Sequence, residues 1–140
     1  MGNLSKHPIC ILVVDDHQDT ALVLRRALTR TGHQVMIAGS CDEGLAFAKS
    51  LQFDLLICDI GLPDGDGCEV MGHIRKLYPI KAIALTGYGM PADIERFSDA
   101  GFDAFLLKPV ELTKLEAAID KITAKLPARP AGQPICHTRL

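Results

Sequence analysis

Apolar residues recur along the chain as five short, uninterrupted runs, at residues 9–14, 35–38, 55–58, 82–85 and 104–107. Runs without polar alternation are typical of strands that are covered on both faces, as in a parallel sheet. Between the runs lie longer segments in which apolar residues return every three or four positions, which is helical spacing. These segments are residues 18–30, 41–51, 68–77, 91–100 and 111–126. The chain therefore alternates strand and helix five times.

This alternation predicts an α/β fold, a (βα)5 unit with a doubly wound, five-stranded parallel sheet. Right-handed crossovers then place helices on both faces of the sheet. A chain of 140 residues with 48% apolar residues is long enough for one domain with a core of its own. We expect an N-terminal extension at residues 1–8, the domain at 9–126 and a flexible, proline-containing tail or linker remnant at 127–140.

Charge and cysteine content exclude several classes of protein. The formal net charge is −2, which gives a polyanion little attraction, so direct nucleic-acid binding is not expected. There is no apolar run of the roughly 18 residues that a membrane-spanning helix needs. The five cysteines, an odd number without metal-ligand spacing, predict reduced thiols in a cytoplasmic protein.

Polar residues with related chemistry follow four of the five predicted strands. Asp15 and Asp16 follow the first, Asp59 the third, Thr86 the fourth and Lys108 the fifth. Because ligands of open α/β sheets bind at the carboxyl ends of the strands, we expect these side chains to meet at one edge. A single Asp after a strand is more often a helix cap, but the whole set is not explained in that way.

Three carboxylates in one place repel one another unless one is protonated or a cation binds. An all-oxygen donor set favours Mg²⁺ over Zn²⁺. Lys108 and Thr86 suit an anionic oxygen, and a carboxylate can act as a nucleophile that forms an aspartyl phosphate. These residues indicate an Mg²⁺-dependent phosphoryl acceptor. His17 adjoins the acidic pair, but the five histidines have no ligand spacing, and we expect His17 on the surface.

At these residues the sequence resembles the receiver domain of two-component response regulators, the family of the bacterial chemotaxis regulator. The resemblance covers residues 9–126, and its motifs are Val13-Val14-Asp15-Asp16, Leu56-Ile57-Cys58-Asp59, Pro63-Asp64-Gly65-Asp66-Gly67, Leu85-Thr86-Gly87 and Leu107-Lys108-Pro109. It implies a flavodoxin-like sheet with strand order 2-1-3-4-5. It also implies a cis Lys108–Pro109 peptide bond.

The resemblance implies a role for each matching residue. Asp59 is the phosphoacceptor, and Thr86 and Lys108 contact the phosphoryl group. Mg²⁺ is bound by Asp16, Asp59 and the backbone carbonyl of Gly61, with Asp15 acting mostly through water. Thr86 moves toward the phosphoryl group, and Phe105 occupies the position of the switch aromatic residue, three residues before the lysine.

The resemblance also implies how the protein works. Its partner is a histidine kinase or a His-containing phosphotransfer protein, and it is not an enzyme beyond catalysing part of its own phosphorylation and dephosphorylation. The glycine-rich motifs look most like receivers attached to hybrid sensor kinases. The alternatives on a similar fold are an aspartate-nucleophile phosphatase, which usually carries a second Asp where Gly61 stands, or a flavodoxin-like protein. Two carboxylates after the first strand would repel a flavin phosphate.

Overall fold

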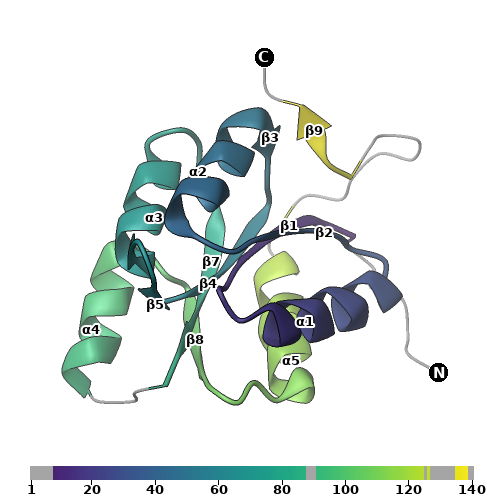
Figure 1. Ribbon diagram of the computed structural model, residues 1–140. Coiled ribbons are helices and arrows are strands. Elements are labelled where there is room, and N and C mark those ends of the chain that lie inside the picture. Colours follow the sequence, from purple (N-terminus) through teal and green to yellow (C-terminus); the bar gives the residue numbers. More distant parts are fainter. Residues whose placement is uncertain (1–7, 88–90, 125, 127–134, 139–140) are drawn as a thin grey trace.

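The computed structural model describes residues 8–87, 91–124, 126 and 135–138. A five-stranded sheet crosses the centre of the molecule, in the order β2-β1-β4-β7-β8 (Figure 1). Every neighbouring pair in it is parallel. Its strands are β2 (Gln34–Ala38), β1 (Cys10–Val14), β4 (Leu55–Asp59), β7 (Lys81–Thr86) and β8 (Ala104–Leu107). In chain order this is 2-1-3-4-5, so the predicted fold is confirmed.

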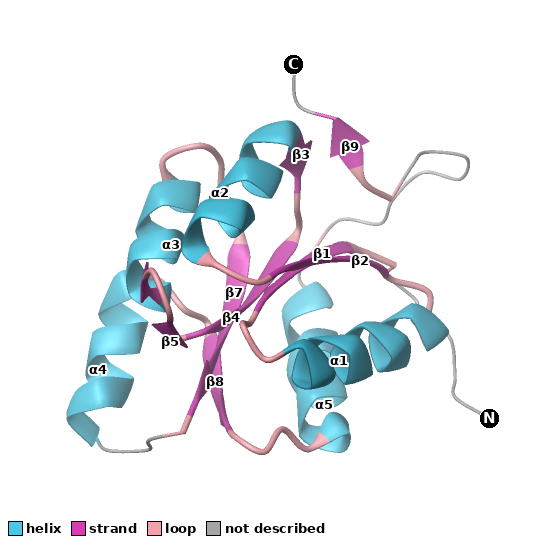
Figure 2. Ribbon diagram, in the orientation of Figure 1, coloured by secondary structure: helices cyan, strands magenta, loops and turns pink. Residues whose placement is uncertain are grey.

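Helices cover both faces of the sheet (Figure 2). On one face lie α1 (Gln18–Arg30) and α5 (Leu112–Thr123). On the other lie α2 (Cys41–Ser50), α3 (Gly67–Arg75) and α4 (Pro91–Ala100). The predicted helix over 111–126 is shorter in the structure, because Glu111 is its N-cap residue and Ala124 its C-cap residue. No helix in the described ranges is long and apolar enough to cross a membrane.

The apolar runs are uninterrupted because each central strand contributes to two hydrophobic clusters. In β1, Leu12 and Val14 pack on the side of α2 and α3, whereas Ile11 and Val13 pack on the side of α1 and α5. All five residues of β1 and all five of β4 are buried. At the sheet edge, β8 leaves Phe105 and Leu107 exposed.

Four two-residue strands were not predicted, and one of them begins at Leu51, where the predicted helix over 41–51 was expected to end. β5 (Gly61–Leu62) pairs antiparallel with β6 (Gly65–Asp66), which makes a small hairpin after β4. β3 (Leu51–Gln52) pairs antiparallel with β9 (His137–Thr138) near the C-terminus. Residues 135–138 therefore differ from the predicted flexible tail, while residues 127–134, 139 and 140 lie outside the described part of the chain.

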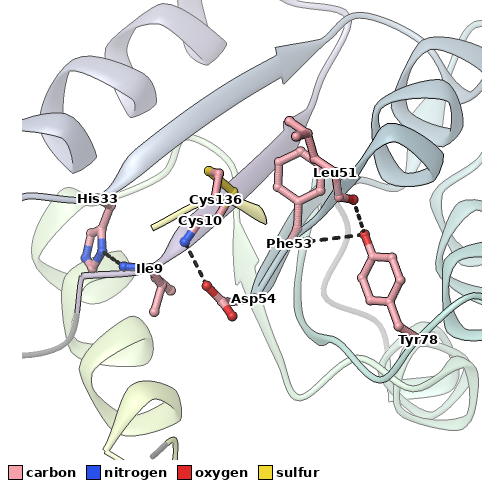
Figure 3. The surroundings of a disulfide bond; sticks show 8 residues. All are labelled: Ile9, Cys10, His33, Leu51, Phe53, Asp54, Tyr78 and Cys136. Carbon is pink, nitrogen blue, oxygen red and sulfur yellow. Dashed lines mark hydrogen bonds between the residues drawn. A yellow bond between two sulfur atoms is a disulfide. The ribbon is translucent and has the colours of Figure 1, made fainter. Parts of the chain in front are cut away.

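The prediction of five reduced cysteines is wrong, because Cys10 and Cys136 form a disulfide (Figure 3). Ile135 and Cys136 pack against the hydrophobic cluster on the α2 side, and the β3–β9 pairing fixes their position. The two Cα atoms are 5.1 Å apart, within the range that disulfides span. The cysteines lie 126 residues apart in sequence, so only the folded chain brings them together. Cys41, Cys58 and Cys68 are free thiols.

Hydrogen bonds to side chains fix the backbone around the disulfide (Figure 3). Asp54 accepts a hydrogen bond from the backbone N–H of Cys10 at 2.9 Å. The Tyr78 hydroxyl donates to the Leu51 carbonyl and accepts from the Phe53 N–H. Buried backbone groups at this amino end of the sheet thus have partners, as a stable core requires.

Candidate functional site

Polar side chains meet at the carboxyl edge of the sheet, as predicted. Asp15 directly follows β1, Asp59 ends β4, and Thr86 ends β7. All three are buried, with exposed fractions of 1%, 6% and 3%. Lys108 follows β8, and its backbone N–H donates to the Thr86 carbonyl at 2.8 Å. Parallel pairing of β1, β4, β7 and β8 is what brings these residues to one edge.

Lys108 lies between the two buried carboxylates. Its Nζ donates a hydrogen bond to Asp59 Oδ2 at 2.8 Å and lies 3.2 Å from Asp15 Oδ2. Partial burial lowers the pKa of Lys108, but the hydrogen bond to Asp59 and the charges of Asp15 and Asp59 outweigh it, so the pKa is raised. The ammonium is therefore held firmly charged. The Lys108–Pro109 peptide bond is cis, as the resemblance implies.

Asp59 is a carboxylate in a site that disfavours its charge. Burial raises its pKa, the nearby charge of Asp15 raises it further, and Lys108 and the Gly61 N–H act in the opposite direction. The net effect is a raised pKa. The Gly61 N–H donates to Asp59 Oδ1 at 3.2 Å, which places Gly61 beside the acidic group.

The acidic group fits a divalent cation. Asp15, Asp16, His17 and Asp59 each offer one ligand atom, and these atoms all lie within 4.8 Å of one another. Asp15 Oδ2 is buried and accepts no hydrogen bond of regular geometry, and the contact that it makes is the ion pair with Lys108 Nζ at 3.2 Å. Carboxylate oxygens are the ligands that Mg²⁺ prefers, and a cation would relieve the repulsion among three carboxylates.

Comparison with known proteins agrees with this geometry. Residues 11–120 match the response regulator receiver domain family. The chain belongs to this family. It is 34% identical over 125 residues to the KDP operon transcriptional regulatory protein KdpE of Escherichia coli K12, covering 89% of this chain and 56% of that protein. The receiver domain thus spans little more than half of that relative.

Solved structures of receiver domains have the same fold. A CheY-like receiver domain protein from Methanospirillum hungatei is 33% identical, with a TM-score of 0.75, and the match covers 84% of this chain and 98% of that one. A Burkholderia pseudomallei response regulator, solved with a phosphorylated aspartic acid, a calcium ion and citrate, is 28% identical with a TM-score of 0.75. That match covers 84% of this chain and 70% of the other. The chain is a receiver domain of two-component signalling.

Most of the predicted site residues of this receiver domain lie together. Asp15, Asp16, Asp59 and Lys108 share one cluster, with Gly61 and Thr86 next to it. Phe105 lies apart from the acidic cluster, on edge strand β8, with 39% of its surface exposed. Its Cα is paired in register with Ala84 of β7, two residues before Thr86.

The turn after Asp59 depends on two neighbouring residues. Asp66 is the N-cap of α3, and its Oδ1 accepts a hydrogen bond from the Cys68 N–H at 2.7 Å. Gly67 begins α3 directly against the phosphoacceptor candidate: a Cβ placed there would lie 2.6 Å from the carbonyl oxygen of Asp59. Only glycine allows this close approach of helix and strand.

The sequence did not predict the contacts of the His17 imidazole with the acidic pair. Its side chain is 65% exposed, as expected for a surface residue, yet Nδ1 lies 3.2 Å from Asp15 Oδ1 and 3.4 Å from Asp16 Oδ1. The backbone N–H of His17 also donates to Asp15 Oδ1, at 2.9 Å. His17 precedes α1 but its side chain makes no capping hydrogen bond. Its position directly after the acidic pair was the available signal.

Proposed function

We propose that Asp59 accepts a phosphoryl group from phosphohistidine on a histidine kinase or a His-containing phosphotransfer protein. The observation that carries this proposal is the contact between the buried Asp59 carboxylate and Lys108 Nζ, beside a second buried carboxylate and at the edge where parallel strands end. The phosphorylated aspartic acid in the Burkholderia pseudomallei relative supports the same chemistry.

Transfer requires Asp59 to be ionised and accessible. A carboxylate oxygen of Asp59 forms a bond to phosphorus while the P–N bond of the phosphohistidine breaks, and the released imidazole takes up a proton from water. Lys108 pairs with the incoming phosphoryl oxygens as charge builds up there. Thr86, at the adjacent strand end, donates a hydrogen bond from its hydroxyl to an oxygen of the bound phosphoryl group.

Mg²⁺ would be bound by Asp16, Asp59 and the Gly61 carbonyl, with Asp15 acting through water, and when bound it supplies neutralisation of the transferring phosphate. Asp15, Asp16 and Asp59 then no longer repel one another. Phosphorylation biases an equilibrium between two conformations, in which Thr86 moves toward the phosphate and Phe105 changes its exposure.

The domain is residues 9–126, and we assign it a signalling role in the cytoplasm without direct nucleic-acid binding or membrane insertion. The competing activity on this fold, an aspartate-nucleophile phosphatase, lacks support because Gly61 occupies the position of the second catalytic Asp. The domain is therefore not an enzyme toward other substrates. It turns over only its own aspartyl phosphate.

Labelling by a small phosphodonor tests the assignment. With Mg²⁺ and acetyl phosphate, intact-mass measurement should find one phosphoryl group on the wild-type chain and none on Asp59→Asn. Asp64→Asn is the matched control, because Asp64 is a carboxylate in the same β4–α3 connection whose contacts are with the start of α2. Equal labelling of wild type and Asp59→Asn would refute the proposal, as would turnover of unrelated phosphoesters.

Lys108 tests the electrostatic part of the mechanism. Lys108→Arg keeps the charge but replaces a compact ammonium with a planar fork, so labelling should slow by about tenfold or more. Lys114→Arg, at an exposed ion pair of α5, should label at the wild-type rate. A wild-type rate in Lys108→Arg would mean that the position of the charge is unimportant.

A further inference from the structure

We propose that His17 supplies an imidazole nitrogen to the cation site, so that the site prefers first-row transition ions such as Co²⁺ and Mn²⁺ to Mg²⁺. This inference rests on the proposed cation site of the acidic cluster and adds a ligand to it. It makes the residue after the acidic pair a determinant of metal specificity.

The distances around His17 fit coordination. Nδ1 lies 3.2 Å from Asp15 Oδ1, 3.4 Å from Asp16 Oδ1 and 4.0 Å from Asp59 Oδ2. With metal–ligand distances near 2.1 Å, neighbouring ligands of an octahedral ion lie about 3 Å apart and opposite ligands about 4 Å apart. The separations of Nδ1 from these three carboxylates therefore lie in the range expected between groups that surround one ion.

The loop holds the imidazole in this position. The backbone N–H of His17 donates to Asp15 Oδ1, and Nδ1 of the same residue lies 3.2 Å from that oxygen. One carboxylate oxygen of Asp15 thus contacts both the main chain and the ring of His17. The His17 side chain makes no hydrogen bond that caps α1. Ligation through Nδ1 places the remaining N–H on Nε2, at the exposed side of a ring with 65% of its surface accessible.

Nitrogen changes which ion the site favours. Mg²⁺ binds oxygen ligands almost exclusively. An imidazole ligand raises the affinity of a site for Mn²⁺, Co²⁺, Ni²⁺ and Zn²⁺, and the affinity increases from Mn²⁺ through Co²⁺ to Ni²⁺. The two partly exposed free thiols, Cys41 and Cys68, compete poorly for these ions. Burial raises the pKa of Cys41 to about 12 and that of Cys68 to about 11, which keeps both protonated at neutral pH.

Metal titration of the full chain measures the preference. By calorimetry, His17→Gln should lower Co²⁺ affinity by at least tenfold and change Mg²⁺ affinity by less than about twofold. His73→Gln, an exposed histidine of α3, is the matched control and should leave both affinities unchanged. An unchanged Co²⁺ to Mg²⁺ ratio in His17→Gln would overturn the proposal.

A second measurement detects the nitrogen ligand directly. Pulsed electron paramagnetic resonance of Mn²⁺ bound to the wild-type chain should detect nitrogen coupling from an imidazole, and this coupling should disappear in His17→Gln. Absence of nitrogen coupling in the wild type would mean that His17 only hydrogen-bonds Asp15. Failure of the proposed phosphoacceptor is separable, because it abolishes labelling at Asp59 and leaves the metal preference intact.

Discussion

Gly67 shows how closely a single residue can control the position of a reactive side chain. Its N–H donates to the Ile60 carbonyl at 2.9 Å, and its missing Cβ leaves room for the Asp59 carbonyl, the Ile60 Cα and the Cys58 Sγ. Two of these three neighbours are backbone atoms of β4 and of the residue after it, which cannot rotate away. The start of α3 and the end of β4 are thus in direct contact only because position 67 has no side chain.

We therefore expect Gly67→Ala to destabilise the fold by about 1–3 kcal/mol and to reduce labelling of Asp59, since the Asp59 backbone has to shift. Chemical denaturation and the acetyl phosphate assay measure the two effects. Gly72→Ala is the control in the same helix. Nothing lies within 4 Å of a Cβ at position 72, so that change should stabilise the protein by about 0.5–1 kcal/mol. Equal stability of the two variants would contradict the packing argument.

The ionised Asp59 carboxylate costs stability in the metal-free protein. Its pKa in the folded state lies above the ordinary value of 3.8, because of burial first and of Asp15 next. The folded state binds this proton more tightly than the unfolded state, so the contribution of Asp59 to stability falls as pH rises through the folded pKa. At pH 7 without metal, Asp59→Asn should therefore unfold at a higher denaturant concentration than wild type, and the difference should vanish below pH 3.8.

Asp64 gives a control of opposite sign. Hydrogen bonds from the Cys41 and Asp42 N–H groups lower its pKa, so its contribution is present above 3.8 and is lost as pH falls through the folded value. Asp64→Asn should thus be less stable than wild type at pH 7. An Asp59→Asn protein less stable than wild type at pH 7 would mean that Lys108 compensates for more than the burial and the Asp15 charge.

Sequence patterns predicted which residues lie at the site, but they did not predict the contacts that these residues make. Asp15, Asp59, Thr86 and Lys108 could be predicted because each stands at a strand end, and strand ends of a parallel sheet share an edge. His17 and Gly67 could not, because their roles depend on distances of a few ångströms across a loop. The position of His17 directly after Asp15 and Asp16 places it near the site, but it does not specify that Nδ1 faces three carboxylates.

At the scale of elements, Asp66 connects two helices on one face of the sheet. Its Oδ1 caps α3 through the Cys68 N–H, and its Oδ2 accepts a hydrogen bond from Arg96 Nη1 of α4 at 2.9 Å. The first contact satisfies a partly buried helix terminus, whereas the second is an ion pair exposed to solvent. Helix caps contribute more to the free energy of unfolding than exposed ion pairs do. Substitutions that remove one contact or both can therefore separate the two roles of the Asp66 carboxylate.

We expect Asp66→Ala to lose about 1–2 kcal/mol of stability, because both contacts disappear. Asp66→Asn keeps a capping oxygen and should lose less than about 1 kcal/mol. Arg96→Gln should lose a similar amount, because it leaves the cap in place and removes the ion pair and the contact of Arg96 with the Phe97 ring. Equilibrium denaturation of the three variants gives the order. A loss in Asp66→Asn as large as in Asp66→Ala would assign the stabilisation to the charge and not to the cap.

The long elements of the fold could be predicted because each contains enough residues for a period to be visible. Uninterrupted apolar runs indicate buried strands, and β1 and β4 are indeed buried at every position. Two-residue strands carry no period at all. β3 and β9 exist because the chain far from each in sequence supplies its partner, and the sequence alone does not specify that pairing.

At the scale of the whole molecule, the acidic cluster and the disulfide lie at opposite ends of the sheet. Cys10 begins β1 and Asp15 follows its last residue, so the disulfide and the acidic cluster lie about 16 Å apart along one buried strand. The disulfide attaches residues 135–138 to the amino end of β1, next to the hydrogen-bonded groups of Leu51, Phe53 and Tyr78 (Figure 3). In a reducing cytoplasm such a bond is more often transient than permanent.

The disulfide should therefore affect stability without affecting the chemistry at Asp59. It closes a loop across 126 residues of sequence separation, and loss of that constraint on the unfolded chain is expected to cost about 3–5 kcal/mol.

Because Cys10 is fully buried, the protein has to be reduced in denaturant and refolded with reductant present. The reduced wild type and Cys136→Ser should then share a lower denaturation midpoint, and Cys41→Ser should keep the redox dependence of the wild type. All of them should still label at Asp59, because the acidic cluster is at the other end of β1. Identical midpoints for oxidised and reduced wild type, with thiol titration confirming reduction, would contradict this assignment of stability to the Cys10–Cys136 bond.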